Sequence, residues 1–221
     1  MDWDRFAKDR IDVGVATDDP EVLVFVERTV GVAPETLRVS RSTTQFRFDV
    51  RSSILKVNLV EGTTPAAKPL GDVLLVHDVT EPETRLGPAG LRVTLVPPGH
   101  DGVEHLDLEL GVCDVAAARD FYGVGMGWDI DGDDVVIGKS RLRLRPDDSI
   151  SSIGLSWAYF TVQIRDCDAE TERAVAHGAR VERPPRTYGE TARFSMVTDP
   201  DGNLFELSQR ASLTGPLPTN E

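Results

Sequence analysis

The chain has 221 residues, 40% of them hydrophobic, and its 37 acidic side chains outnumber 24 basic ones to give a net charge of −13. This length and content suffice for a sizeable core, whereas the negative charge argues against nucleic acid as a partner. No apolar run reaches the length of a membrane span, and the charged start MDWDRFAKDR is unlike a signal peptide. We therefore expect a globular cytoplasmic protein that does not bind a membrane.

The first expected unit opens with the alternating strand IDVGVATDD from Ile11. Asp19-Pro20 suits the start of a helix, and Gly31 suits its end. The unit is expected to finish with a strand over Gly87–Val96. Two inserts rich in Pro, Thr and Glu are expected before that strand, around Thr63–Pro69 and Asp78–Pro88.

The second unit repeats this order. The strand LDLELGVCD starts at Leu106, a helix is expected from Asp114 to Gly123, and the segment SRLRLRP predicts a later strand.

The third unit starts with FTVQIRDCD from Phe160 and continues with a helix that Asp168 caps and Gly178 ends. An Asp199–Asn203 turn then leads into a final strand, Leu204–Gln209, because proline and glycine in DPDGN favour a tight connection.

The first strands of the three units can be laid over one another, and each runs into an acidic helix cap. Such internal repetition predicts three β-α-β-β-β modules in an α+β fold with mostly antiparallel, curved sheets. Cys113 and Cys167 occupy equivalent positions in the second and third units and are expected to be reduced.

On YFTVQIRDCD, AHGARV and ARFSMVTDPDGNLFELSQ, the chain resembles the vicinal oxygen chelate superfamily, which includes glyoxalases, bleomycin-resistance proteins and extradiol dioxygenases. The resemblance implies that two modules share one curved sheet around a cup-shaped cleft. We expect residues 103–210 to form such a two-module domain, residues 1–98 a diverged module with inserts, and 211–221 a tail.

Strand alternation predicts which side chains line the cup. If Leu106, Leu108 and Leu110 face the helices, the polar residues between them face the cleft. The same rule gives the full set of expected lining residues: His105, Asp107, Glu109, Arg141, Arg143, Arg145, Tyr159, Thr161, Gln163 and Glu206. An ordinary solvent-exposed sheet face shows the same alternation.

The resemblance also implies positions for metal ligands, at the start of each module's first strand and within its last strand. His105 and Glu206 match such positions, whereas Tyr159 and Arg143 stand where further ligands are expected. One imidazole and one carboxylate would hold a divalent cation weakly unless water or substrate completed its shell. His105 is alternatively an acid–base group paired with Glu206, or a sheet histidine without a role in chemistry.

The sequence therefore favours a small-molecule-binding protein with a degenerate metal site, or a metal-independent enzyme using the same cup. The alternative is a divalent-metal-dependent lyase, isomerase or ring-cleaving dioxygenase that uses His105 and Glu206, and a structural or regulatory module needs neither residue. Because the first module alone would leave a half-cup and an unpaired sheet edge, we also expect a homodimer.

Overall fold

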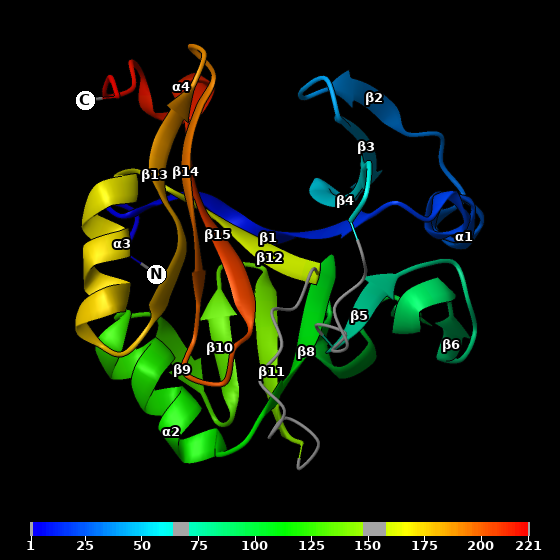
Figure 1. Cartoon of the computed structure of the whole chain (residues 1–221). Helices are drawn as coiled ribbons and strands as arrows, with labels where there is room; N and C mark the ends of the chain where they lie inside the picture. The colour runs from blue at the N-terminus through cyan, green and yellow to red at the C-terminus, as the bar shows by residue number, and fades with distance from the viewer. Residues whose placement is uncertain (1, 64–70, 148–157, 221) are drawn as a thin grey trace.

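The computed structural model describes residues 2–63, 71–147 and 158–220, and it contains two curved sheets (Figure 1). In the described residues the large sheet has eight strands in the order β13-β14-β15-β12-β1-β4-β3-β2. The small sheet has seven, in the order β6-β7-β5-β8-β11-β10-β9. No helix in these ranges is long and apolar enough to cross a membrane.

Three β-α-β-β-β modules are present, which confirms the predicted fold class. The first contains β1 (Phe6–Thr17), α1 (Pro20–Val30), β2 (Glu35–Arg38), β3 (Thr43–Val50) and β4 (Ser53–Val60). The second contains β8 (Leu106–Val112), α2 (Val115–Arg119), the π-helix η3 (Asp120–Gly125), β9 (Asp129–Asp131), β10 (Asp134–Ile137) and β11 (Ser140–Pro146). The third contains β12 (Ala158–Ile164), α3 (Cys167–Ala176), β13 (Arg180–Tyr188), β14 (Ala192–Thr198) and β15 (Leu204–Arg210), followed by α4 (Ala211–Thr214).

A further unit lies between the first two modules and was not expected as such. It consists of β5 (Gly71–Val76), β6 (Glu83–Leu86), the short helix η1 (Pro88–Gly90), β7 (Arg92–Val96) and the short helix η2 (His100–Gly102). The strand expected over Gly87–Val96 is β7, but it pairs with β5 and β6 in the small sheet and does not close the first module. Of the two expected inserts, the second includes β6, and nearly all of the first lies outside the described residues.

The expectation that the last two modules share one sheet is wrong. Strand β12 pairs antiparallel with β1 of the first module, with Val13 opposite Phe160, whereas β8 pairs antiparallel with β5, with Leu108 opposite Val73. In both pairs apolar side chains face each other across the strands, which favours this register. Both sheets therefore cross the boundaries expected at 98 and 103, and that division into domains stays a prediction.

The caps of α1 lie at the predicted residues, whereas the N-cap of α3 lies two residues earlier than predicted. Asp19 accepts a hydrogen bond from Glu21 N, and Gly31 ends α1 with a φ of +73°, as the sequence indicates. In α3 the cap is Asp166, which accepts from Ala169 N. Asp168 was wrongly assigned as that cap.

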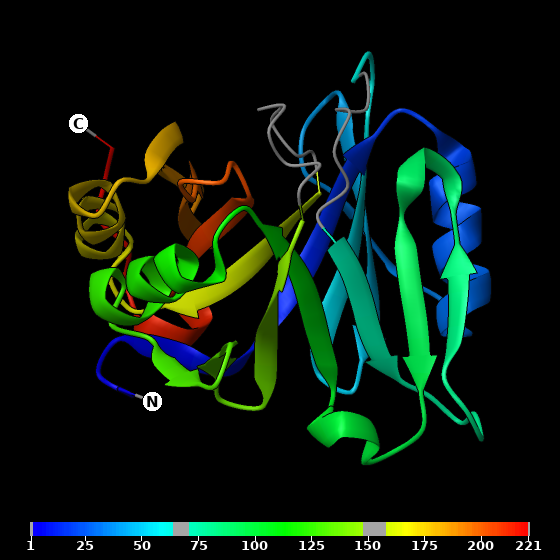
Figure 2. The ribbon, with the colours of Figure 1, turned by 90° about the horizontal axis from the view of Figure 1, so that it is seen from below.

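The apolar faces of the two sheets form one core. Leu106, Leu108 and Leu110 are fully buried in the same cluster as Phe160 and Val162 of the other sheet. This confirms the predicted alternation along β8. Helices α2 and α3 lie together at one end of the molecule and α1 at the other (Figures 1 and 2).

The DPDGN turn is tied to the second module by a buried hydrogen-bond network. The hydroxyl of Tyr122 donates to Asp199 Oδ2 at 2.8 Å, and Asn203 donates to the same oxygen at 2.9 Å and to Gly111 O at 3.1 Å. Gly202 has a φ of +83°, which glycine adopts without strain. Burial raises the pKa of Asp199 above its usual range, and the hydrogen bonds from Asn203 and Tyr122 oppose that rise.

We predict that Tyr122→Phe lowers the free energy of unfolding by about 1–3 kcal/mol, because it removes a donor from a buried carboxylate. Since the folded pKa of Asp199 is already raised and this change raises it further, the loss grows as pH rises through that pKa. Urea denaturation at acidic and neutral pH measures both effects. Tyr188→Phe, an exposed tyrosine, is the control, and an equal loss in both variants would contradict the prediction.

Candidate functional site

The polar face of the large sheet is built by strands of the first and third modules. Along β4, Leu55 and Val57 enter the core, so Lys56 and Asn58 lie on the opposite face. The same alternation on β1, β3, β12 and β15 completes a polar set on this face: Asp12, Gln45, Arg47, Tyr159, Thr161, Gln163, Glu206, Ser208 and Arg210.

Lys56 lies at the centre of this face, and its side chain is only 2% exposed. Its ammonium group donates to Thr161 Oγ1 at 2.9 Å and lies 3.8 Å from Asp12 Oδ2 and 4.0 Å from Glu206 Oε1. A buried charge is stable only when it is paired and hydrogen-bonded. One side-chain cation therefore joins carboxylates from the first and third modules.

Tyr159 covers one side of the lysine, whose Nζ lies 5.9 Å from the ring centre. The phenol oxygen accepts a hydrogen bond from Asn58 Nδ2 at 3.0 Å, and Asn58 Oδ1 in turn accepts from Gln45 at 2.8 Å. Burial raises the pKa of Tyr159, with the nearby Glu206 charge adding to the rise, so the phenol stays protonated. A Cβ at Gly14 would come within 2.3 Å of this ring, so glycine is needed beneath it.

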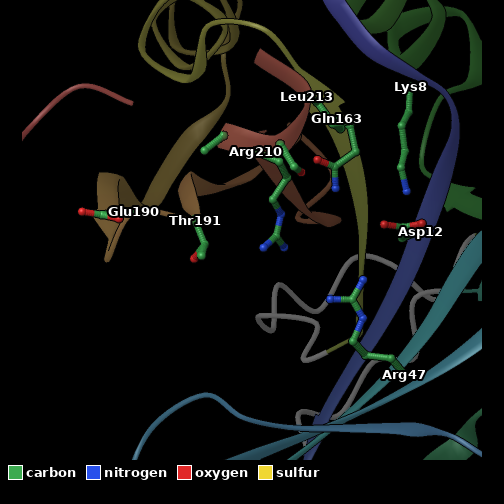
Figure 3. A pocket seen from close by; sticks show the side chains of 10 residues that line it. Lys8, Asp12, Arg47, Gln163, Glu190, Thr191, Arg210 and Leu213 are labelled. Carbon is green, nitrogen blue, oxygen red and sulfur yellow. The ribbon is translucent and has the colours of Figure 1, made fainter. Parts of the chain in front are cut away.

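A cavity of about 340 Å³ opens beside this cluster (Figure 3). Its polar lining comes from four strands, the loop before β14 and α4: Lys8, Asp12, Arg47, Gln163, Glu190, Thr191, Arg210 and Ser212. Gln163 is 3% exposed, and its Oε1 accepts no hydrogen bond from the described residues. Glu206 Oε1, 4.0 Å from the lining residue Arg210, is likewise buried without a hydrogen-bond donor among them.

The corresponding face of the small sheet is closed by its own ion pairs. Asp107 is fully buried and accepts from Arg143 at 2.9 and 3.1 Å and from Arg141 N at 2.9 Å. Burial raises the pKa of Asp107, and these hydrogen bonds limit the rise. Glu109 pairs with Arg145 at 3.3 Å. These partners occupy the groups that a ligand would need.

The structure divides the residues expected around one cup between two sheets. Tyr159, Thr161, Gln163 and Glu206 lie together on the large sheet, whereas Asp107, Glu109 and Arg143 lie on the small sheet. His105 precedes β8, and its Nδ1 lies 2.5 Å from Arg51 O. It is therefore not brought beside Glu206, and its place in a catalytic pair stays a prediction.

Sequence reasoning missed Asp12, Lys56, Asn58 and Arg210. A signal for Asp12 was available, because overlaying the three first strands puts it level with Asp107 and Thr161. Lys56 and Asn58 follow from the alternation in ILKVNL, but only once this segment is recognised as the last strand of the first module.

The divalent metal that the resemblance implies does not fit these residues. The first and last strands of the two modules supply Asp12, Lys56, Thr161 and Glu206, and the lysine ammonium already lies between the two carboxylates. A divalent cation placed there would be repelled by it. Across the described ranges, no group of three or more histidine, cysteine, aspartate or glutamate side chains is arranged to hold a metal.

Comparisons with known proteins agree with this architecture. Residues 102–207 match the family model described as Glyoxalase/Bleomycin resistance protein/Dioxygenase superfamily. Glyoxalase I from Zea mays has a similar structure, with a TM-score of 0.68 at 14% identity over 90% of this chain and 92% of that one. A candidate dioxygenase from Bacillus subtilis subsp. subtilis str. 168 gives 0.58 at 12% identity, over 90% and 84%.

At these identities the structural likeness shows a shared fold and nothing finer. A search of curated proteins gives no match. The second and third modules, which lie almost wholly within residues 102–207, are therefore the part of the chain that is similar to the glyoxalase/bleomycin resistance protein/dioxygenase superfamily.

Proposed function

We propose that this chain is a small-molecule-binding protein whose ligand occupies the polar face of the large sheet, and that Lys56 takes the place of the divalent cation that the resemblance implies. The observation that carries the proposal is the position of Lys56 Nζ, 2.9 to 4.0 Å from Thr161, Asp12 and Glu206, beside the cavity that Asp12 lines. Cavities of this size, with a few convergent polar groups, suit small organic ligands.

The same groups support a metal-independent reaction. An ammonium held in a buried site stabilises negative charge that develops on a nearby ligand oxygen. Glu206 Oε1 accepts no hydrogen bond from the described residues, so it is available to take a proton from the ligand. Lys56 and Glu206 are therefore the electrostatic and general-base groups of this proposal.

The alternative, metal-dependent chemistry through His105 and Glu206, has less support because the structure does not bring these residues together. The homodimer and the cytoplasmic location stay predictions. The original reason for a dimer is removed, since β1 has strand partners on both sides within its own chain. Light scattering over a concentration series tests the oligomeric state.

We predict that Lys56→Met lowers the free energy of unfolding by about 3–5 kcal/mol, because Asp12 and Glu206 are left buried without their cation. Adding Mn²⁺ should raise the melting temperature of this variant and leave that of the wild type unchanged. Lys139→Met, at a lysine 49% exposed and 4.0 Å from Asp9, is the control and should cost at most about 1 kcal/mol. Stoichiometric metal in the purified wild type that is lost on Glu206→Gln would refute the proposed role of Lys56.

Substitutions on the two sheets locate the ligand. Fragments that bind the wild type in ligand-observed NMR should bind Gln163→Leu about tenfold more weakly, because a polar group facing the cavity is removed. Glu109→Gln, on the small sheet, should bind them unchanged. If instead the fragments bind Glu109→Gln more weakly and bind Gln163→Leu as tightly as the wild type, the ligand site lies on the small sheet.

A further inference from the structure

Two arginines converge on the cavity from different modules. Arg47 lies on β3 of the first module and Arg210 ends β15 of the third, and both line the cavity. Figure 3 shows their guanidinium groups pointing into the same hollow. Their side chains are 28% and 29% exposed, so both remain reachable from solvent.

Neither guanidinium has a close carboxylate partner among the interactions of the described residues. Arg47 Nε is buried without a hydrogen-bond acceptor, and its ion pair with the exposed Glu35 spans 3.8 Å. Arg210 lies 4.0 Å from Glu206. By contrast, Arg193 of the same sheet makes two 2.6 Å hydrogen bonds to Asp168. Arg47 and Arg210 thus retain donors that a ligand can use.

The charges around the cavity do not cancel. Arg47 stands directly opposite Lys56 in the β3–β4 register, and like charges in that position destabilise a sheet. Lys56, Arg47 and Arg210 carry three positive charges against Asp12 and Glu206, and Lys8 and Glu190 at the edge offset each other. One positive charge is left over, and the exposed Glu35, 3.8 Å from Arg47, offsets it only weakly because solvent screens that pair. In a chain with a net charge of −13, this local excess favours a ligand with a single negative charge.

The ligand should also carry a hydrogen-bond donor. Gln163 Oε1 and Glu206 Oε1 are buried acceptors without a donor from the described residues. A hydroxyl group beside the anionic group would satisfy one of them. The cavity volume of about 340 Å³ exceeds what a single inorganic ion fills, so the anion belongs to an organic molecule.

We infer that Arg47 and Arg210 form a clamp for a small organic carboxylate, with a hydroxylated acid as the favoured class. The inference rests on the proposed function, because the clamp borders the cavity assigned above, and it adds the charge and class of the ligand. A planar carboxylate accepts hydrogen bonds from two guanidinium groups at once and relieves the repulsion between Arg47 and Lys56.

The test compares glycolate and benzoate with the neutral benzamide and with inorganic phosphate, in low-salt buffer at up to tens of millimolar. Thermal shift measures binding, and the ¹⁵Nε signals of the arginines locate it. The carboxylates should raise the melting temperature and move the signals of Arg47 and Arg210, whereas benzamide should not. Phosphate acting as strongly as both carboxylates would show a general anion site and overturn the assignment of an organic acid.

Variants separate the clamp from a structural role. Arg47→Gln and Arg210→Gln should lose the shift caused by glycolate and benzoate. Unliganded Arg47→Gln should melt at or above the wild-type temperature, because the like-charge contact with Lys56 is gone. Arg85→Gln, at an arginine on β6 paired with Glu83, should keep the full shift. Carboxylate shifts retained in both cavity variants would overturn the inference.

The outcomes also distinguish this inference from the proposed function. One outcome is that neutral fragments bind through Gln163 but glycolate and benzoate do not bind. This result would refute the arginine clamp and would still support the proposed binding site. Arginine-dependent binding of carboxylates by a protein that also holds stoichiometric metal supports the clamp and refutes the role given to Lys56.

Discussion

The pairing of β1 with β12 is the contact on which the site depends. It joins the first strand of the chain's first module to the first strand of its third, through the antiparallel register that sets Asp12 opposite Thr161 and Gly14 opposite Tyr159. On the outer sides of these two strands, β4 and β15 add Lys56 and Glu206. Every member of the central cluster thus comes from strands brought together by this pairing. A shift of this register by one residue would put the polar side chains of one of the two modules on the opposite face, and the cluster would not form.

The two sheets share a common feature at their centres. Each pairs a buried side-chain cation with carboxylate, Lys56 with Asp12 and Glu206 on one sheet and Arg143 with Asp107 alone on the other. They differ in how completely the charges are paired. Arg143 donates two hydrogen bonds to Asp107 and a third to Asp101 O, which fixes its position. The lysine pairs at longer range and leaves Glu206 Oε1 without a donor from the described residues. The large sheet is therefore the one equipped for a ligand.

Much of the fold was predictable, because its signals are local. Proline and aspartate at the start of α1, a glycine at its end, and the leucines of β8 each act through neighbouring residues, and the structure confirms them. The choice of sheet partners is not local. Nothing within LDLELGV indicates that it pairs with β5, which lies between the two expected inserts. The prediction of a two-module sheet is wrong for this reason. The predicted site contains the same error. The side chains were assigned to the correct faces of their strands, but strands of two different sheets were expected to line one cleft.

A lysine at the centre of the cup limits the chemistry that the cup can support. An ammonium carries one positive charge and donates up to three hydrogen bonds, but it has no vacant coordination position for a substrate oxygen. It therefore stabilises an anion by charge and hydrogen bonding, without the polarisation that a divalent cation gives as a Lewis acid. Asp12 and Glu206 also outnumber it, which leaves Arg47 and Arg210 to supply the remaining positive charge. The charge that a metal would concentrate at one point is thus spread over three side chains. Such an arrangement recognises an extended anion more readily than it activates a single bond.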